Sequence, residues 1–234
     1  MKSATILFLH GAGNEGSVWN ETIKKLPEYY RCYAPDLPGH GKQPGRCESI
    51  RKYAEWVIDY IEENSLEDIV VVGHSMGGAT AITVAALCEK VSALMIVGSG
   101  LRLPVNPKIL NGLTDSPMRT IETIAKWSFS LSVSKEIKNR AIQMMIRNKN
   151  SLLNDFSACD KYDGFAAAKK IKIPVLLSVG ENDVMTPIQM SKQAAENLGG
   201  DVVKIKNAGH MVQIENPEML SSIIIDFINR QRDC

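Results

Sequence analysis

Short, fully apolar runs alternate with longer amphipathic stretches along most of this 234-residue chain, and that alternation constrains its fold strongly. Six runs lack the polar–apolar alternation of a strand with one face in water, so each is predicted to be a strand buried on both faces. These runs are residues 4–9, 31–34, 68–72, 91–97, 175–179 and 202–205. The stretches with helical spacing include residues 50–63, 78–89, 187–198 and 217–229. The sequence therefore predicts an α/β fold: a mostly parallel six-stranded sheet with helices on both faces.

Residues 101–170 break this rhythm. They contain no run that suits a strand, but apolar residues recur at helical spacing, as in Ile121, Ile124 and Trp127. Seventy residues are far too many for a simple connection between two strands. We predict a helical cap over residues 101–170, inserted into a core formed by residues 1–100 and 171–234.

The predicted cap differs from the core in charge. It carries 12 Lys and Arg against 6 Asp and Glu, a net charge of +6, whereas the whole chain has only +1. This excess either attracts an anionic substrate or merely solvates helix faces. Five cap residues are candidates for a substrate pocket, although each could instead pack the cap onto the sheet. They are Trp127, Phe129, Met144, Met145 and Phe156.

Composition excludes several classes of function. The near-neutral charge gives no general attraction to nucleic acid or anionic membranes. No apolar run approaches the roughly 18 residues of a membrane span, and the first residues make a poor signal peptide. The histidines do not cluster and no H-E-x-x-H occurs, so we expect no metal and no cofactor. The cysteines are odd in number and widely spaced, which indicates free thiols and a cytoplasmic protein. They are Cys32, Cys47, Cys88, Cys159 and Cys234.

A glycine-flanked serine follows the third predicted strand, in the segment Gly73-His74-Ser75-Met76-Gly77. This G-x-S-x-G pattern suits a nucleophile on a sharp strand-to-helix turn, because only small neighbours let the chain pass. The helix that follows would place unpaired N–H groups beside the reacting oxygen. Since an apolar strand precedes the pattern and a helix of small residues follows it, we interpret Ser75 as a nucleophile.

Four further segments occur in a recognisable order: His10-Gly11-Ala12-Gly13, residues 36–41 (D-L-P-G-H-G), residues 180–187 (G-E-N-D-V-M-T-P) and residues 207–210 (N-A-G-H). Together with G-H-S-M-G-G at residues 73–78, they resemble the α/β-hydrolase superfamily over nearly the whole chain. The resemblance implies a mostly parallel sheet with an eight-strand reference form, of which this chain starts at the third strand. It also implies a cap after the sheet's sixth strand, where residues 101–170 lie.

A serine hydroxyl needs a base, and four histidines are available. His10 and His40 lie in glycine turns that they more plausibly brace, and His74 should point away from its neighbour Ser75. His210 lies at the carboxyl edge of the sheet, after a plausible acid, Asp183. The order Ser75, Asp183, His210 matches that of the fold, with Asp183 orienting the imidazole. Glu181 is the rival acid, and Thr186 suits a cap of the following helix better than Asp183 does.

The oxyanion of a tetrahedral intermediate would need two backbone N–H donors. Met76, after the nucleophile, and Ala12, in the loop after the first strand, are the candidates. The alternative for this loop is phosphate binding, because residues 11–16 spell G-x-G-x-x-G. A convincing acid at the end of the second strand is missing, which disfavours a dinucleotide site.

These patterns predict a serine hydrolase that cleaves small or medium carboxylic esters, its small-molecule substrates, through an acyl-enzyme on Ser75. Relatives with similar motifs also cleave C–C bonds, lactones or thioesters or catalyse a lyase step, and some act as small-molecule receptors. The G-x-S-x-G turn cannot separate these functions, since specificity resides in the cap and loops. The oligomeric state is left open by the sequence.

Overall fold

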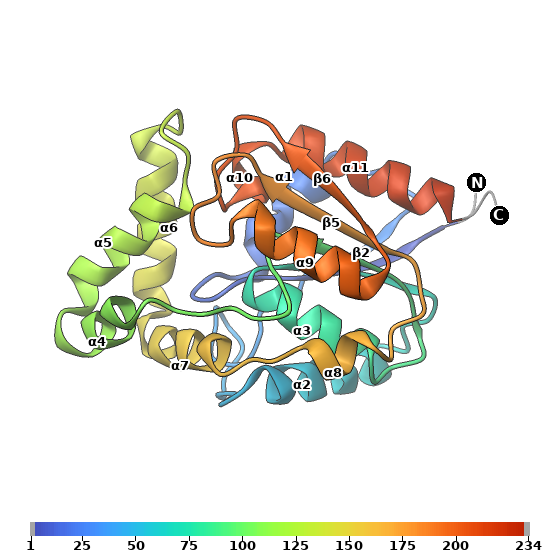
Figure 1. Ribbon diagram of the computed structural model, residues 1–234, viewed down its shortest axis with the longest axis horizontal. Coiled ribbons are helices and arrows are strands. Elements are labelled where there is room, and N and C mark those ends of the chain that lie inside the picture. Colours follow the sequence, from blue (N-terminus) through green and yellow to red (C-terminus); the bar gives the residue numbers. More distant parts are fainter. Residues whose placement is uncertain (1–2, 232–234) are drawn as a thin grey trace.

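The computed structural model describes residues 3–231, and its centre is a six-stranded sheet (Figure 1). The order of strands is β2-β1-β3-β4-β5-β6, and every neighbouring pair is parallel. The predicted mostly parallel six-stranded sheet is thereby confirmed. The strands are β1 (Thr5–Leu9), β2 (Arg31–Tyr33), β3 (Ile69–His74), β4 (Val91–Val97), β5 (Val175–Gly180) and β6 (Asp201–Ile205).

Helices cover both faces of this sheet. They are η1 (Gly16–Trp19), α1 (Asn20–Ile23), α2 (Ile50–Glu63), α3 (Met76–Ala85), α8 (Phe165–Ala168), α9 (Ile188–Leu198), α10 (Val212–Glu215) and α11 (Pro217–Arg230). One of them, α8, comes from the end of the predicted cap segment, residues 101–170. Helix α3 begins two residues before the predicted start, directly after Ser75. Helix α9 begins at Ile188, with Pro187 as its N-cap residue, and it ends at Gly199 in the left-handed conformation that glycine tolerates best.

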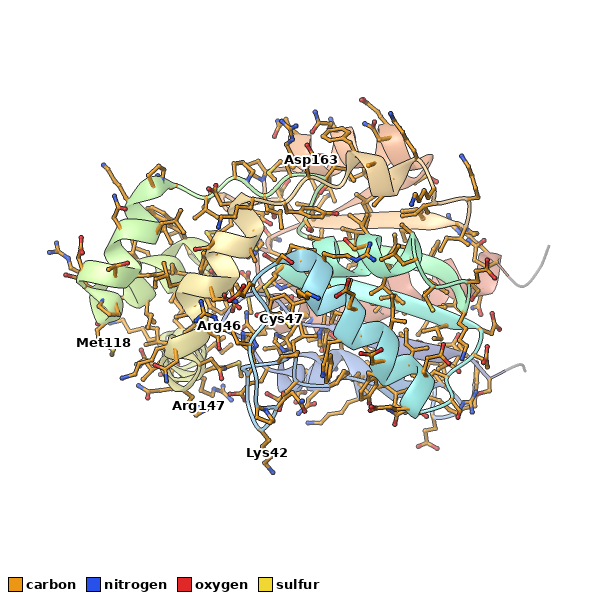
Figure 2. The ribbon with its side chains drawn as sticks, turned by 90° about the horizontal axis from the view of Figure 1, so that it is seen from below. Lys42, Arg46, Cys47, Met118, Arg147 and Asp163 are labelled. Atoms are coloured by element: carbon orange, nitrogen blue, oxygen red, sulfur yellow. The ribbon has the colours of Figure 1, made fainter. Side chains whose placement is uncertain are left out.

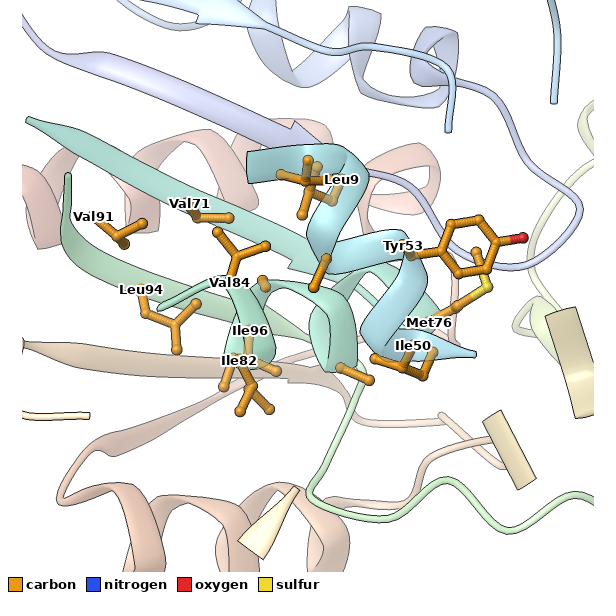
Figure 3. Packing of buried hydrophobic residues seen from close by; sticks show 14 of the residues in the cluster. Leu9, Ile50, Tyr53, Val71, Met76, Ile82, Val84, Val91, Leu94 and Ile96 are labelled. Atoms are coloured by element: carbon orange, nitrogen blue, oxygen red, sulfur yellow. The ribbon is translucent and has the colours of Figure 1, made fainter. Parts of the chain in front are cut away.

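Alternate residues of each strand point to opposite faces, so the sheet separates two apolar clusters. Leu7 and Leu9 of β1 pack with α2, α3 and α9, whereas Ile6 and Phe8 pack with η1 and α11. Figure 3 shows the first cluster, in which side chains of α2 and α3 lie against β3 and β4. Burial on both faces explains why β1, β3, β4 and β5 are almost wholly apolar. The edge strands β2 and β6 are only partly buried and carry Arg31, Asp201 and Lys204, so the prediction of burial on both faces is wrong for these two runs.

The segment between β4 and β5 supplies a third apolar cluster. It folds into α4 (Pro107–Asp115), α5 (Pro117–Ser128), α6 (Lys135–Arg147), α7 (Lys149–Asp160) and α8. Helices α4 to α7 gather at one end of the sheet in Figure 1. Their apolar faces meet one another in a cluster that includes Ile121, Ile124 and Leu152.

Two further observations concern the described part of the chain. Among residues 3–231, no helix combines the length and the apolar character required to cross a membrane. Cys32, Cys47, Cys88 and Cys159 are free thiols, whereas Cys234 lies outside the described residues.

Candidate active site

Ser75 occupies a strained turn between β3 and α3. Its φ of 54° and ψ of −118° are uncommon for a residue with a side chain. The flanking glycines are required by close backbone contacts. A Cβ on Gly77 would lie 2.3 Å from the Leu9 carbonyl oxygen, and one on Gly73 would lie 2.2 Å from the Gly77 carbonyl oxygen. The G-x-S-x-G pattern therefore reflects steric need, and strain of this kind is typical of functional sites.

His210 and Asp183 form a buried pair at the same edge of the sheet. The His210 Nδ1 donates to Asp183 Oδ2 over 2.9 Å, and the side chains are 5% and 0% exposed. A carboxylate can only accept, so the ring proton lies on Nδ1 and the lone pair on Nε2 is available. Gly98 makes room for the pair, because a Cβ there would lie 3.2 Å from Asp183 Oδ2.

Asp183 is held by three further hydrogen bonds. Its Oδ2 accepts from the Thr186 hydroxyl at 2.8 Å, and its Oδ1 accepts from the N–H groups of Met185 and Thr186. Burial alone would raise the pKa of Asp183, but His210 and these donors outweigh it and lower the pKa below its usual value. The expectation that Thr186 caps α9 is wrong, since its hydroxyl bonds Asp183 instead and α9 has no side-chain cap.

Glu181, the rival acid, is not available to His210. Its Oε1 accepts from Lys204 Nζ at 2.9 Å, which places the carboxylate in a surface ion pair. Of the two acids on this loop, only Asp183 contacts the histidine.

Ser75 and His210 both line one cavity of about 270 Å³. The cap provides much of its wall, including its first segment, Leu103–Asn106, and the carboxyl ends of the strands form its floor. No hydrogen bond within residues 3–231 occupies either the Ser75 hydroxyl or His210 Nε2. The structure thus brings the three residues predicted for catalysis to one site, with the serine and the histidine facing the same space.

His74 also lines the cavity, beside His210. Its ring centroid lies 4.6 Å from that of His210, and its Nε2 donates to the His210 carbonyl over 2.9 Å. Burial lowers the pKa of His74 to about 3, so the ring is neutral. Because β3 extends through His74, the strand carries this ring toward the loop of His210.

The two N–H groups predicted to receive an oxyanion are both unengaged. Within the described residues, neither Ala12 N–H nor Met76 N–H donates a hydrogen bond, and Ala12 lines the cavity. Gly11 lets the Ala12 loop approach, since a Cβ there would lie 3.2 Å from Ser75 Cβ. The phosphate alternative conflicts with Gly13 and Gly16, whose N–H groups donate to carboxylates of Asp155 and Asp36.

Three of the five predicted pocket residues line the cavity: Trp127, Met145 and Phe156. Phe129 and Met144 do not, and this part of the prediction is corrected. Phe129 follows α5 and is buried in the cluster on the α11 face of the sheet, and Met144 packs against that cluster. Hydrophobic character alone does not indicate whether a cap residue faces the cavity or packs in the cluster against the sheet.

Sequence reasoning missed much of the lining. The missed residues come from the segment after β4, including α4, and from the loop before α9 and the first turn of that helix. They include Leu103, Val105, Ile109, Val184, Met185 and Met190. Those in loops give no periodic signal. Asn14, Asn106 and Cys159 also line the cavity, but no Lys, Arg, Asp or Glu does so among the described residues.

A covered parallel sheet with a strained serine turn and a buried His–Asp pair at its carboxyl edge defines an α/β hydrolase. The chain belongs to this family, because the model of the Alpha/beta hydrolase family matches residues 6–222. It is a hydrolase, as the esterase names among its relatives also indicate.

Two relatives and one solved structure illustrate the similarity. The pimeloyl-[acyl-carrier protein] methyl ester esterase of Vibrio campbellii is 26% identical over 82% of each chain. The putative esterase/lipase 2 of Mycoplasma pneumoniae is 29% identical over 99% of this chain and 92% of its own. The structure of a thermophilic esterase has a TM-score of 0.86 and 28% identity, covering 96% of this chain and 89% of that one.

Proposed function

We propose that this hydrolase is a serine esterase for small or medium, neutral carboxylic esters, and that it acts through an acyl-enzyme on Ser75. The observation that carries the proposal is the buried hydrogen bond from His210 Nδ1 to Asp183, at the wall of the cavity that Ser75 also lines. The esterase names of relatives support ester chemistry.

The geometry supports a two-step reaction. His210 Nε2 accepts the Ser75 proton as the serine oxygen attacks the ester carbonyl, and Asp183 stabilises the imidazolium. The N–H groups of Ala12 and Met76 receive the negative oxygen of the tetrahedral intermediate. His210 then returns the proton to the leaving alcohol. Water, deprotonated by the same ring, releases the acid and regenerates Ser75.

The cavity favours small neutral substrates. Its volume of about 270 Å³ lies just below the ~300–1,000 Å³ typical of small-molecule sites. Its walls are mainly apolar and carry no Lys or Arg. The positive charge of the cap lies elsewhere: Arg147, for example, is 57% exposed and pairs with Glu15 on the outside of the cap (Figure 2). This arrangement favours neutral esters over the anionic ones considered from the sequence.

Steady-state and burst kinetics with p-nitrophenyl butyrate test the proposal. Wild type should release about one nitrophenolate per enzyme in a burst, and Ser75→Ala should lose roughly 10,000-fold or more in kcat. Ser92→Ala is the matched control, because Ser92 lies near the start of β4, at the other end of the sheet. Wild-type turnover by Ser75→Ala would overturn the mechanism. Cleavage of a thioester or lactone, but of no ester, would overturn the bond type alone.

The remaining expectations are untested. A cytoplasmic location stays a prediction from the cysteine pattern. Division of the chain into a core and a cap at residues 101–170 is likewise proposed as a functional division, in which the cap selects the substrate.

A further inference from the structure

Asp155 is a fully buried carboxylate on the cap helix α7, and all of its hydrogen-bond partners lie outside the cap. Its Oδ2 accepts from Gly13 N–H at 2.9 Å and from His40 Nε2 at 2.8 Å. Its Oδ1 accepts from the Tyr53 hydroxyl at 2.6 Å. Buried carboxylates are rare unless paired, so a carboxylate that collects donors from three separate core segments requires an explanation.

His40 supplies the compensating charge. Its Nδ1 faces the carbonyls of Leu37 and Pro38, each at 3.2 Å, while Nε2 faces Asp155. All three neighbours are acceptors, so both ring nitrogens carry protons. Burial lowers the pKa of His40, but Asp155 and the two carbonyls more than offset this and raise it above its usual value. An imidazolium–carboxylate pair therefore joins the cap to the loop after β2.

The third partner, Gly13, belongs to the turn that carries the proposed oxyanion donor. Asn14 N–H donates to the Gly11 carbonyl at 3.2 Å and closes this turn, with Ala12 and Gly13 at its centre. Gly13 has a φ of +65°, which glycine adopts without strain. The peptide between Ala12 and Gly13 is held at both ends: its N–H by Asp155, and its carbonyl by Asn14 Nδ2 at 3.0 Å.

The preceding peptide is fixed from the core. The Gly11 carbonyl accepts from His10 Nδ1 at 2.9 Å, and His10 Nε2 in turn accepts from Leu37 N–H at 2.9 Å. The N–H of a planar trans peptide points opposite to its carbonyl, so this contact directs Ala12 N–H away from His10. Two consecutive peptides are thus fixed, one by the core and one by the cap.

We propose that Asp155 is a positioning residue that holds the Ala12 N–H in place for the oxyanion, through its own contact from the cap to the Gly13 turn. This inference rests on the proposed function. Preorganised donors stabilise an oxyanion only when they are already aimed at it, and a displacement of about 1 Å can cost on the order of a hundredfold in rate. Asp155 itself does not line the cavity.

The same helix provides a matched control in Asn154. This residue is also buried and also joins the cap to the core, since its Nδ2 donates to the Cys47 carbonyl and its Oδ1 accepts from Arg46 Nε at 3.1 Å. Arg46 and Cys47 lie beside the cap in Figure 2. Asn154 makes no hydrogen bond to residues 10–16 among the described contacts, so its loss should loosen the cap without moving the Ala12 turn.

Tyr53 offers a milder perturbation. Its ring packs in the cluster on the α2 face and its hydroxyl points away from the other labelled side chains (Figure 3). Tyr53→Phe removes one donor from Asp155 but leaves the ring, Gly13 and His40 in place. We expect this variant to fold and to hold the Ala12 N–H slightly less firmly in place.

The decisive experiment compares p-nitrophenyl butyrate with its thiono analogue, in which C=S replaces C=O. Sulfur is a weak acceptor, so two N–H donors accelerate the oxygen ester more than the thiono ester. Asp155→Asn should lower kcat for the oxygen ester about ten- to hundredfold per burst-titrated site, while KM stays within about threefold of wild type. The ratio of kcat for the oxygen ester to kcat for the thiono ester should fall about tenfold. Asn154→Ala should lower the thermal midpoint but change neither kcat nor the ratio.

Wild-type kcat and rate ratio in Asp155→Asn would overturn the inference, as would an equal fall of the ratio in Asn154→Ala. Should Asp155→Asn fail to fold, Tyr53→Phe decides: a reduced ratio supports positioning, and a wild-type ratio overturns it. Failure of the proposed function gives a different result, because Ser75→Ala would then turn over like wild type whatever Asp155 does.

Discussion

The protein contains two buried histidine–aspartate pairs of nearly equal length, 2.9 Å for His210–Asp183 and 2.8 Å for His40–Asp155. In each pair the aspartate collects further donors, which hold it in one orientation. The pairs differ at the other ring nitrogen. The second nitrogen of His40 faces two carbonyls, whereas that of His210 is left without a partner at the cavity.

This difference separates the proposed proton carrier, His210, from a structural ion pair. A general base needs a free lone pair within reach of the proton that it removes, and of the two paired histidines only His210 has one. His40 has all its hydrogen-bonding capacity occupied by acceptors, so it retains its proton and its charge. The distance between histidine and aspartate therefore does not distinguish a catalytic pair from a structural one. The surroundings of the other imidazole nitrogen, the one that does not contact the aspartate, do distinguish them.

The largest expected effect is on turnover. His210→Ala should lower kcat for p-nitrophenyl butyrate roughly 10,000-fold or more, because it removes the proposed acceptor of the Ser75 proton. His40→Ala should lower kcat per burst-titrated site by less than about tenfold, since Asp155 keeps its bonds to Gly13 and Tyr53. Similar losses in the two variants would contradict the division of roles.

Stability should show the reverse order. His40→Ala leaves the Asp155 charge buried without its counter-ion, which costs about 3–5 kcal/mol in the free energy of unfolding. In His210→Ala, Asp183 keeps three hydrogen bonds and lies beside the cavity, so we expect a smaller loss. Urea unfolding with linear extrapolation measures both values. A smaller loss in His40→Ala than in His210→Ala would show that the His40 pair does not support the fold.

The sequence predicted the His210–Asp183 pair of the candidate active site but not its structural counterpart, for physical reasons. Ser75, Asp183 and His210 each follow a strand in a short turn, and parallel strands bring such turns to one edge. Asp155 is more than 100 residues from Gly13, His40 and Tyr53, so no local pattern connects them. One signal was present in the sequence, because Asp155 lies on the buried face of α7 together with Leu152. A charged residue on an apolar helix face indicates a buried partner, since charged side chains are rarely buried unless paired.

The cap was predicted less well than the sheet for a related reason. A strand buried on both faces is apolar at every position, so its location is clear from composition alone. A cap helix presents apolar residues both to the sheet and to the cavity. Phe129 and Met144 turned toward the sheet cluster, whereas Met145, adjacent in sequence to Met144, turned toward the cavity.

The smallest expected effect is on the pH dependence of stability, to which the two pairs should contribute in opposite directions. The pKa of Asp183 is lowered on folding, so its stabilising contribution is present above the unfolded value of 3.8 and is lost as pH falls through the folded pKa. The pKa of His40 is raised, so its contribution is complete below the unfolded value of 6.5 and is lost as pH rises through the folded pKa. One pair therefore weakens in acid and the other in base.

Unfolding free energies of wild type and His40→Ala, measured from pH 6 upward, test the second half of this prediction. The gap between the two proteins should narrow as pH rises, because a deprotonated His40 no longer compensates Asp155. The groups around His40 do not produce the same trend: burial lowers the pKa of His10 to about 3, burial raises the pKa of Tyr53, and burial raises the pKa of Cys47 to about 11. A gap that stays constant or widens would mean that His40 is neutral beside Asp155, and the ionic account of this pair would have to be replaced by a neutral hydrogen bond.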